Sequence, residues 1–141
     1  MADLSMTPDD LDTFLTEERV LRLATLDEEG WPAVVPLWFV WHAEAIWVWN
    51  LTRARRTRRM EEGTRCAFTV DAGHDYGELR GASGRLDYAF VDDAEVPVEV
   101  RAAFSAKYLG SDEPLQPADH HQWVRMVPTT LRTWDFRRLG S

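Results

Sequence analysis

The sequence contains one cysteine, one lysine and no long hydrophobic segment. A lone cysteine, Cys66, cannot form an internal disulfide, which suits a reducing cytoplasm. The apolar run from Trp31 to Trp41 has eleven residues, well short of the roughly 20 that a membrane helix needs. The first residues, MADLSMTPDDLD, are acidic and lack the basic and then apolar order of a signal peptide. We therefore predict a cytoplasmic protein without a membrane partner.

The rest of the composition is typical of a folded globular domain. The chain has 141 residues, of which 45% are hydrophobic and seven are tryptophan, which is enough to build a core. This length predicts a single domain over residues 1–141. The formal net charge of −8 argues against non-specific binding to DNA or to anionic lipid.

Residues 6–11, MTPDDL, have the pattern of a helix start. Thr7 can cap the helix, and Pro8 suits its first position. Met6 and Leu11 have the spacing of a hydrophobic staple. The spacing of the following apolar residues predicts a short amphipathic helix.

From Val20 onwards the hydrophobic period becomes that of β-strands. VLRLATLDEEGWPAVVPLWFV is β-branched and aromatic on both sides of DEEG, where Gly30 can supply the positive φ of a hairpin turn. We expect a third strand over Ala45–Leu51, after a turn at WHAE. Pro36 lies inside the second strand and cannot donate to the ladder, so it marks an edge or a bulge.

The second half of the chain predicts more strands and one helix. RCAFTVD is a fourth strand, 78–90 a long strand or bent pair, and QWVRMVPTTLRTWDF final strand material with a break at Pro128. A helix should begin near Pro97 and end at Gly110. About five to seven short strands and three helices, mostly linked by hairpins, indicate an α+β domain, mainly β, built on an antiparallel barrel.

Five arginines stand within seven positions of this acidic chain, in LTRARRTRRM. The segment 53–62 predicts a short helix, capped by Thr52 or Asn50. Cations in the first turns of a helix oppose its dipole, by roughly 0.3–1 kcal/mol each, and they repel one another. A bound anion would relieve both effects, and guanidinium groups bind phosphate in bidentate fashion.

Two other interpretations of the cluster remain open. The arginines could form a solvated helix face, neutralised by Glu61 and Glu62. Nucleic-acid binding is disfavoured because the basic segment is single and short and the whole chain is acidic, so we predict no nucleic-acid partner.

The ordered motifs resemble those of a known family. LATLDEEGWPAVVPLWFVW, then IWVWNLT, then RARRTRRMEEGTRCAFTVD are similar to the pyridoxamine 5'-phosphate oxidase-like, flavin-binding split-barrel family, and TTLRTWDF resembles its last strand. The resemblance covers nearly the whole chain, from Leu11 to Phe136. This chain departs from the family at RRM, 58–60, and at Thr64, where the family has a proline.

The resemblance implies a six-stranded split barrel that forms a homodimer, with two cofactor sites at the subunit interface. The family's basic helix holds the cofactor phosphate, and the VVPLW strand lies along the cofactor ring. Carried over to this chain, the phosphate would be bound by Arg56 with help from Arg55 and Thr52. The ring would lie near Pro36, Leu37, Trp38 and Leu51, with Trp134 approaching from the other subunit.

The function implied by the resemblance is that of an oxidoreductase. A flavin-type cofactor, FMN or the deazaflavin coenzyme F-420, would exchange a hydride with a small, conjugated organic substrate. Five arginines exceed what one FMN phosphate needs, and F-420 carries a phosphodiester and an anionic oligoglutamate tail, which favours F-420. The chain lacks the C-terminal extension of true pyridoxamine phosphate oxidases, so vitamin B6 oxidation is not expected. The alternative is a non-enzymatic flavin- or haem-binding protein on the same barrel.

Other reactive residue types form no recognisable catalytic pattern. His120 and His121 are adjacent, but neighbouring side chains on a strand point apart, so we predict no metal site. No side chain is required as a catalytic acid or base, and we name none. Cys66 is expected in the core. The tryptophans at 38, 41, 47 and 49 are expected in the core, in a dimer interface or around an apolar pocket.

Overall fold

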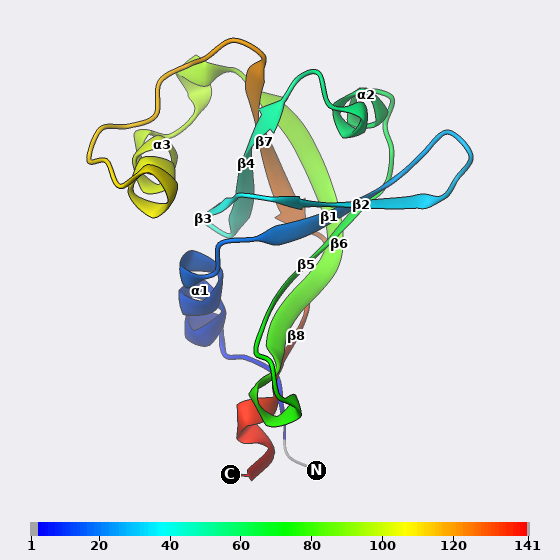
Figure 1. The fold of residues 1–141 in the computed structure, drawn as a ribbon, viewed down its shortest axis with the longest axis vertical. Helices are drawn as coiled ribbons and strands as arrows, with labels where there is room; N and C mark the ends of the chain where they lie inside the picture. The colour runs from blue at the N-terminus through cyan, green and yellow to red at the C-terminus, as the bar shows by residue number, and fades with distance from the viewer. Residues whose placement is uncertain (1–2, 141) are drawn as a thin grey trace.

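A computed structural model describes residues 3–140 of the chain. These residues form three α-helices and eight β-strands, with shorter helical turns between them (Figure 1). In chain order the elements are α1 Pro8–Glu17, β1 Leu21–Leu26, β2 Pro32–Leu37, β3 Val40–His42, β4 Ala45–Leu51, α2 Arg55–Glu61, β5 Cys66–Ala72, η1 Tyr76–Glu78, β6 Arg80–Val91, η2 Asp93–Glu95, α3 Val98–Phe104, η3 Ser105–Leu109, β7 His121–Pro128, β8 Arg132–Asp135 and η4 Phe136–Gly140.

The strands form one antiparallel sheet in the order β2-β1-β5-β6-β7-β4-β3, with β8 paired to β6. The twelve-residue β6 pairs with β5 and β8 along its first half and with β7 along its second half. This confirms the predicted α+β, mainly β, antiparallel architecture and the long strand over 78–90. The strand order ends at β2 on one side and at β3 on the other, and these two strands are not paired in the described chain, so the barrel is split between them.

The local signals at the N-terminus are confirmed. Thr7 accepts from the backbone N–H of Asp10 at 3.1 Å, and Asp10 accepts in return from the N–H of Thr7, which completes a capping box. Pro8 occupies the first helical position of α1. Phe14 and Leu15 are buried on the inner face of this helix.

Two tight turns shape the first four strands. Gly30 has φ of 81° in the β1–β2 turn, as the sequence predicts, and β2 is an edge strand, which accommodates Pro36. The predicted second strand is shorter than expected, because pairing with β1 ends at Leu37 and a separate strand, β3, begins at Val40. The predicted turn at WHAE lies between β3 and β4, where Ala43 and Glu44 have positive φ. Alanine and glutamate rarely adopt this conformation.

Two hydrophobic clusters hold the fold together. The first fills the barrel with side chains from α1, β1, β4, β5, β6 and β7, and it includes Cys66, as predicted, together with Met60 of α2. The second lies between α3 and the outer face of β4 and β7, around Trp47, Phe104 and Trp123. Because both faces of β4 are covered, its residues 45–48 are all buried.

The α3 region also agrees with the sequence pattern. Pro97 is the N-cap of α3, the helix continues as the π-helical turn η3, and Gly110 ends it with φ of 62°. Within residues 3–140, no helix is long and apolar enough to cross a membrane.

Candidate cofactor site

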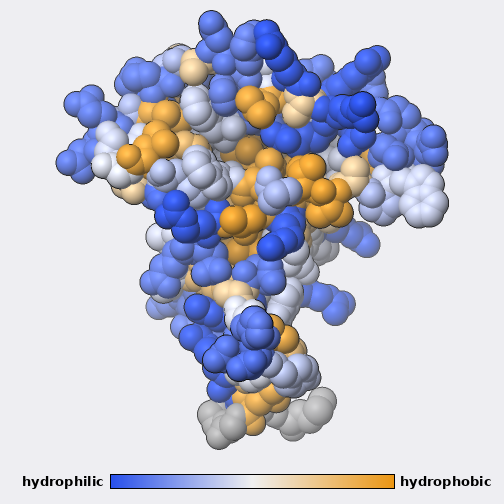
Figure 2. Space-filling model, in the orientation of Figure 1, coloured by the Kyte–Doolittle hydropathy of each residue, from blue (hydrophilic) through white to orange (hydrophobic). Residues whose placement is uncertain are grey.

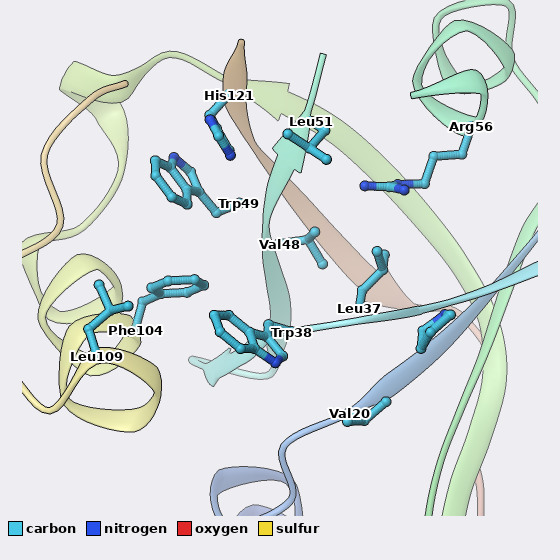
Figure 3. Close-up of a pocket in the computed structure, with 11 residues that line it drawn as sticks. Val20, Leu37, Trp38, Val48, Trp49, Leu51, Arg56, Phe104, Leu109 and His121 are labelled. Carbon is cyan, nitrogen blue, oxygen red and sulfur yellow. The ribbon is translucent and has the colours of Figure 1, made fainter. Parts of the chain in front are cut away.

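A cleft of about 480 Å³ opens at the split of the barrel (Figure 3). The end of β2 and the start of the β2–β3 connection form one side of it, and β4 forms the other. Arg56 of α2 stands at one end, and α3 with η3 stands at the opposite end. The cleft is lined by Val20, Pro36, Leu37, Trp38, Val48, Trp49, Leu51, Arg56, Phe104, Leu109 and His121. Figure 2 shows apolar residues gathered in the middle of this face of the molecule, bordered by hydrophilic ones.

Aromatic rings build the end of the cleft beside α3. Trp38 stacks on Tyr108, with ring centroids 4.4 Å apart and planes at 12°, and its ring tilts toward Phe104 at 6.1 Å. Trp49 meets Phe104 edge-on at 5.7 Å. Trp38 remains 49% exposed, so this ring presents a face to the cleft instead of filling the core.

Tyr108 also fixes the backbone beside Trp38. Its hydroxyl accepts from the N–H of Phe39 at 2.9 Å, and its oxygen lies 2.9 Å and 2.8 Å from the carbonyl oxygens of Phe39 and Arg19. Burial raises the pKa of Tyr108 to about 12, so the hydroxyl keeps its proton. The neighbouring Lys107 donates to the carbonyls of Leu15 and Phe39.

Arg56 is held by a chain of hydrogen bonds from its own neighbourhood. Its Nε donates to Oδ1 of Asn50 at 3.0 Å, and Nδ2 of Asn50 donates to Oγ1 of Thr57 at 2.7 Å. The Thr57 hydroxyl donates in turn to the carbonyl of Leu51 at 2.6 Å. Asn50 and Thr57 are both buried, so the guanidinium is anchored by an ordered polar network.

The guanidinium of Arg56 extends from α2 into the cleft, toward Leu51 (Figure 3). Burial lowers the pKa of Arg56 below the usual arginine value, but arginine stays protonated in proteins. Within residues 3–140 no carboxylate lies within 4 Å of it. A half-buried cation without a carboxylate partner is unfavourable unless an anion accompanies it.

The helix that carries Arg56 differs from the expectation in its cap. It begins at Arg55, its N-cap is Ala54, and no side chain caps it. The predicted caps are wrong because Asn50 turns inward to hold Arg56, while Thr52 is exposed. An anion in the cleft would therefore be bound by the Arg56 side chain and not by the helix terminus.

The other four arginines of the cluster do not line the cleft. Arg53 contacts Nε2 of His120 at 2.7 Å, and Arg55 is exposed. Arg58 pairs with Glu62, in agreement with the solvated-face interpretation for this one residue. Arg59 lies 3.9 Å from a carboxylate oxygen of Glu28.

His121 contributes a second polar group to the cleft. Its ring stacks on Trp49, with centroids 3.9 Å apart and planes at 19°, and its Nδ1 lies 3.0 Å from the carbonyl oxygen of Asp119. The adjacent His120 has φ of 63° and turns away to Arg53. No group of three His, Cys, Asp or Glu side chains suited to a metal ion occurs in the described part of the chain.

The structure brings together five of the eight residues predicted for the cofactor site. Pro36, Leu37, Trp38, Leu51 and Arg56 line the cleft. Thr52 and Arg55 lie beside it without lining it. Trp134 lies on β8 and packs against Gly81 of β6, at the end of the molecule opposite α2 and α3 (Figure 1).

Five of the lining residues were not predicted from the sequence: Val20, Val48, Phe104, Leu109 and His121. His121 reaches the cleft through the pairing of β7 with β4, and Phe104 and Leu109 reach it through the packing of α3 and η3, which no local motif signals. The only available hint for His121 was its type, since histidine is a common functional residue.

Comparison with known proteins identifies the family of the chain. A sequence model described as pyridoxamine 5'-phosphate oxidase matches residues 7–135. The chain belongs to the pyridoxamine 5'-phosphate oxidase family. None of the curated protein sequences matches the chain.

Solved structures share the split-barrel fold of the family. A conserved hypothetical protein from Mycobacterium tuberculosis has a TM-score of 0.86 at 24% identity, with 100% of this chain and 92% of that chain covered. The haem storage protein HutZ from Vibrio cholerae has a TM-score of 0.72 at 20% identity, covering 90% and 94%. An F-420 reductase has a TM-score of 0.63 at 22% identity, covering 86% and 94%. At these identities the likeness establishes the shared fold.

Proposed function

We propose that the cleft binds a flavin-type cofactor and that the protein is an oxidoreductase, exchanging a hydride between this cofactor and a small conjugated substrate. The observation that carries the proposal is the half-buried Arg56 guanidinium, without a carboxylate partner among residues 3–140, at one end of an apolar cleft. Such a cleft suits an elongated ligand with an anionic group at one end and a flat ring at the other.

The residues present fit this cofactor class. Arg56 would hold the phosphate with its terminal nitrogens, because its Nε is already bonded to Asn50. Leu37, Trp38 and Val48 would pack on the ring and exclude water from it. The bound cofactor supplies the hydride chemistry, while the chain orients it and keeps its surroundings dry.

Between the two candidate cofactors, we favour the deazaflavin F-420 over FMN. Arg53 and Arg55 are exposed near Arg56 and could meet an anionic tail that extends out of the cleft. The F-420 reductase among the structural neighbours supports this choice.

The proposal is tested by titrating the protein with FMN and with F-420 while absorbance and fluorescence are followed. Riboflavin, which has the FMN ring but no phosphate, is the matched control. We expect the phosphorylated ligand to bind at least about tenfold more tightly, the contribution of one charged hydrogen bond. Equal binding of FMN and riboflavin would show that Arg56 does not bind the phosphate. If neither FMN nor F-420 binds, the proposal is wrong. Turnover is then assayed with the reduced cofactor and the quinone menadione.

Haem binding is the second candidate function, and His121 favours it. A histidine with Nδ1 bonded to a carbonyl and Nε2 free has the arrangement of many iron ligands. The haem storage protein among the neighbours has the same fold. A Soret band that forms with haem and disappears in His121→Phe would support this alternative, and then the FMN and F-420 titrations should fail.

A further inference from the structure

We propose that His121 exchanges with the substrate the proton that accompanies hydride transfer in the cleft. This inference rests on the proposed function and adds a residue with a chemical role, which the sequence analysis did not name. It follows from the composition of the cleft lining, the hydrogen bonding of the His121 ring and the positions of nearby charged groups.

The lining offers only two ionisable side chains. Nine of the eleven lining residues are apolar, and the other two are Arg56 and His121. Arginine does not release its proton in proteins. Histidine ordinarily gains and loses a proton near neutral pH. Within the described chain, His121 is therefore the one lining side chain of a type that both donates and accepts a proton.

The ring of His121 is held in a defined orientation. Stacking on Trp49 fixes its plane, and the Asp119 carbonyl, which can only accept, requires a proton on Nδ1. Nε2 is then the nitrogen that takes up and releases the exchangeable proton. Histidines used for proton transfer are commonly oriented in this way, through the nitrogen that does not react.

The charged groups near the cleft do not compete for this role. Arg56 stands across the cleft, and Arg53 contacts the neighbouring His120 instead of His121. Both are permanent cations. They suit the anionic part of a ligand, so the uncharged reacting end of the ligand is placed toward the aromatic end of the cleft.

The α3–η3 side also offers no proton donor to the cleft. It presents Phe104 and Leu109 there. Burial, with Arg19 nearby, lowers the pKa of Lys107 to about 8, but its ammonium is directed to the carbonyls of Leu15 and Phe39 and does not line the cleft.

The proposed step is balanced for a conjugated acceptor such as a quinone. A bound reduced flavin-type cofactor would supply the hydride, which is two electrons and one proton, for one end of the conjugated system. The opposite carbonyl oxygen, which gains negative charge, takes the Nε2 proton from the His121 imidazolium. The neutral imidazole left behind regains a proton from solvent. The substrate class is thus a planar conjugated molecule with a carbonyl-type acceptor at the His121 end.

Two variants and a matched control separate proton exchange from packing. His121→Phe keeps an aromatic ring against Trp49 and removes the proton. His121→Gln keeps a hydrogen-bonding group that does not titrate. His120→Asn is the control, because His120 lies outside the cleft and asparagine tolerates its positive φ. Thermal unfolding of all three is measured first to select variants that fold.

The assay follows menadione reduction by the reduced cofactor, FMN or F-420, between pH 5.5 and 9. We expect both His121 variants to lose about 100-fold or more in kcat/KM and to lose the pH dependence of wild type. Cofactor affinity should change less than about threefold, and His120→Asn should behave as wild type. Independently of activity, nitrogen-detected NMR of the resting protein should show the neutral His121 ring protonated on Nδ1.

The outcomes distinguish this inference from the proposed function. If wild type turns over and His121→Phe has the same rate and pH profile, the role of His121 is wrong and the proposed function stands. A neutral ring protonated on Nε2 would also overturn the inference. If wild type binds neither FMN nor F-420, the proposed function is wrong, and the role of His121 falls with it.

Discussion

Arg56 combines a structural and a binding role in one side chain. Its Nε is used in the network of Asn50 and Thr57, and its terminal nitrogens face the cleft. The two roles can be separated by substitution, because the structural bond needs only one N–H donor and the anion needs the positive charge.

We predict that Arg56→Gln weakens binding of the phosphorylated cofactor by about ten- to 150-fold, the equivalent of roughly 1.5–3 kcal/mol for a charged hydrogen bond. The glutamine amide can still donate to Asn50, so the melting temperature should change little. Arg58→Gln is the matched control, since Arg58 lies on the exposed face of the same helix, paired with Glu62. Cofactor titration and thermal unfolding are the measurements. A large loss of stability with unchanged affinity would make Arg56 a structural residue only.

Trp38 provides a second prediction at this scale. Trp38→Ala should weaken cofactor binding strongly and reduce stability by about 2 kcal/mol or less. Truncation of a fully buried aromatic side chain to alanine costs roughly 3–5 kcal/mol of stability, and the Trp38 ring is 49% exposed. Trp123→Ala is the comparison: Trp123 is 1% exposed, so its truncation should reduce stability by the full amount expected for a buried aromatic. Denaturant unfolding and cofactor titration of both variants decide the matter. If Trp38→Ala destabilises as much as Trp123→Ala and binds normally, Trp38 belongs to the core.

At the scale of elements, α3 and η3 hold the aromatic end of the cleft in place, and Lys107 and Tyr108 of η3, here called the clamp, make the hydrogen bonds that do so. Lys107 and Tyr108 of η3 bond the backbone of Phe39, the residue after Trp38, and Lys107 also bonds the carbonyl of Leu15 in α1. The Lys107 ammonium lies 4.1 Å from the centre of the Phe39 ring. The clamp joins three segments that are distant in the sequence.

The clamp predicts a pH dependence of stability. Burial lowers the pKa of Lys107 from 10.5 to about 8, so between these values the unfolded chain binds more protons than the folded chain. The free energy of unfolding contributed by Lys107 should therefore rise with pH in this window and be lost as pH falls through about 8. Lys107→Met should lack this rise. We predict that wild type gains stability relative to Lys107→Met between pH 7 and 9.5, measured by urea unfolding.

The comparison with Lys107→Met cancels other titrations. Burial raises the pKa of Cys66 to about 11, which lowers stability as pH rises above 9, but Cys66 is present in both chains. A stability difference that stays constant over the pH range would show that Lys107 titrates as an ordinary surface lysine.

Elements were predictable where their signals are local. The capping box of α1, Gly30 in the first turn and Gly110 after η3 each depend on residues adjacent in sequence. The turn at WHAE was predicted and is found at Ala43 and Glu44, but the break at 38–39 that separates β3 from β2 was not, because the run VVPLWFVW is apolar throughout. For the site, family motifs identified Arg56 and the VVPLW strand. His121 was missed because it reaches the cleft only through the register of β7 with β4, which pairs it with Leu51.

At the scale of the whole molecule, the β1–β2 hairpin projects from the barrel (Figure 1), and it carries exposed apolar side chains. Trp31 at its tip is 68% exposed and Val34 in β2 is 61% exposed. The cleft itself is rimmed by the exposed Trp38 and Leu51. Exposed apolar groups of this extent on the face that holds the site are typical of an interface. We propose that a second copy of the chain covers them, giving a homodimer.

The dimer makes a prediction that links assembly to binding. Light scattering at micromolar concentration should give twice the 16.3 kDa mass of one chain. Val34→Glu should shift the mass to that of the monomer, because a buried carboxylate at the interface is strongly unfavourable. It should also weaken cofactor binding if the second copy covers the cleft. Val98→Glu is the control, since Val98 is also an exposed valine, at 50%, but lies in the first turn of α3, where a carboxylate suits the helix dipole. A wild-type monomer that binds cofactor with full affinity would contradict the dimer, whereas loss of both dimer and binding in Val34→Glu alone would tie the site to the interface.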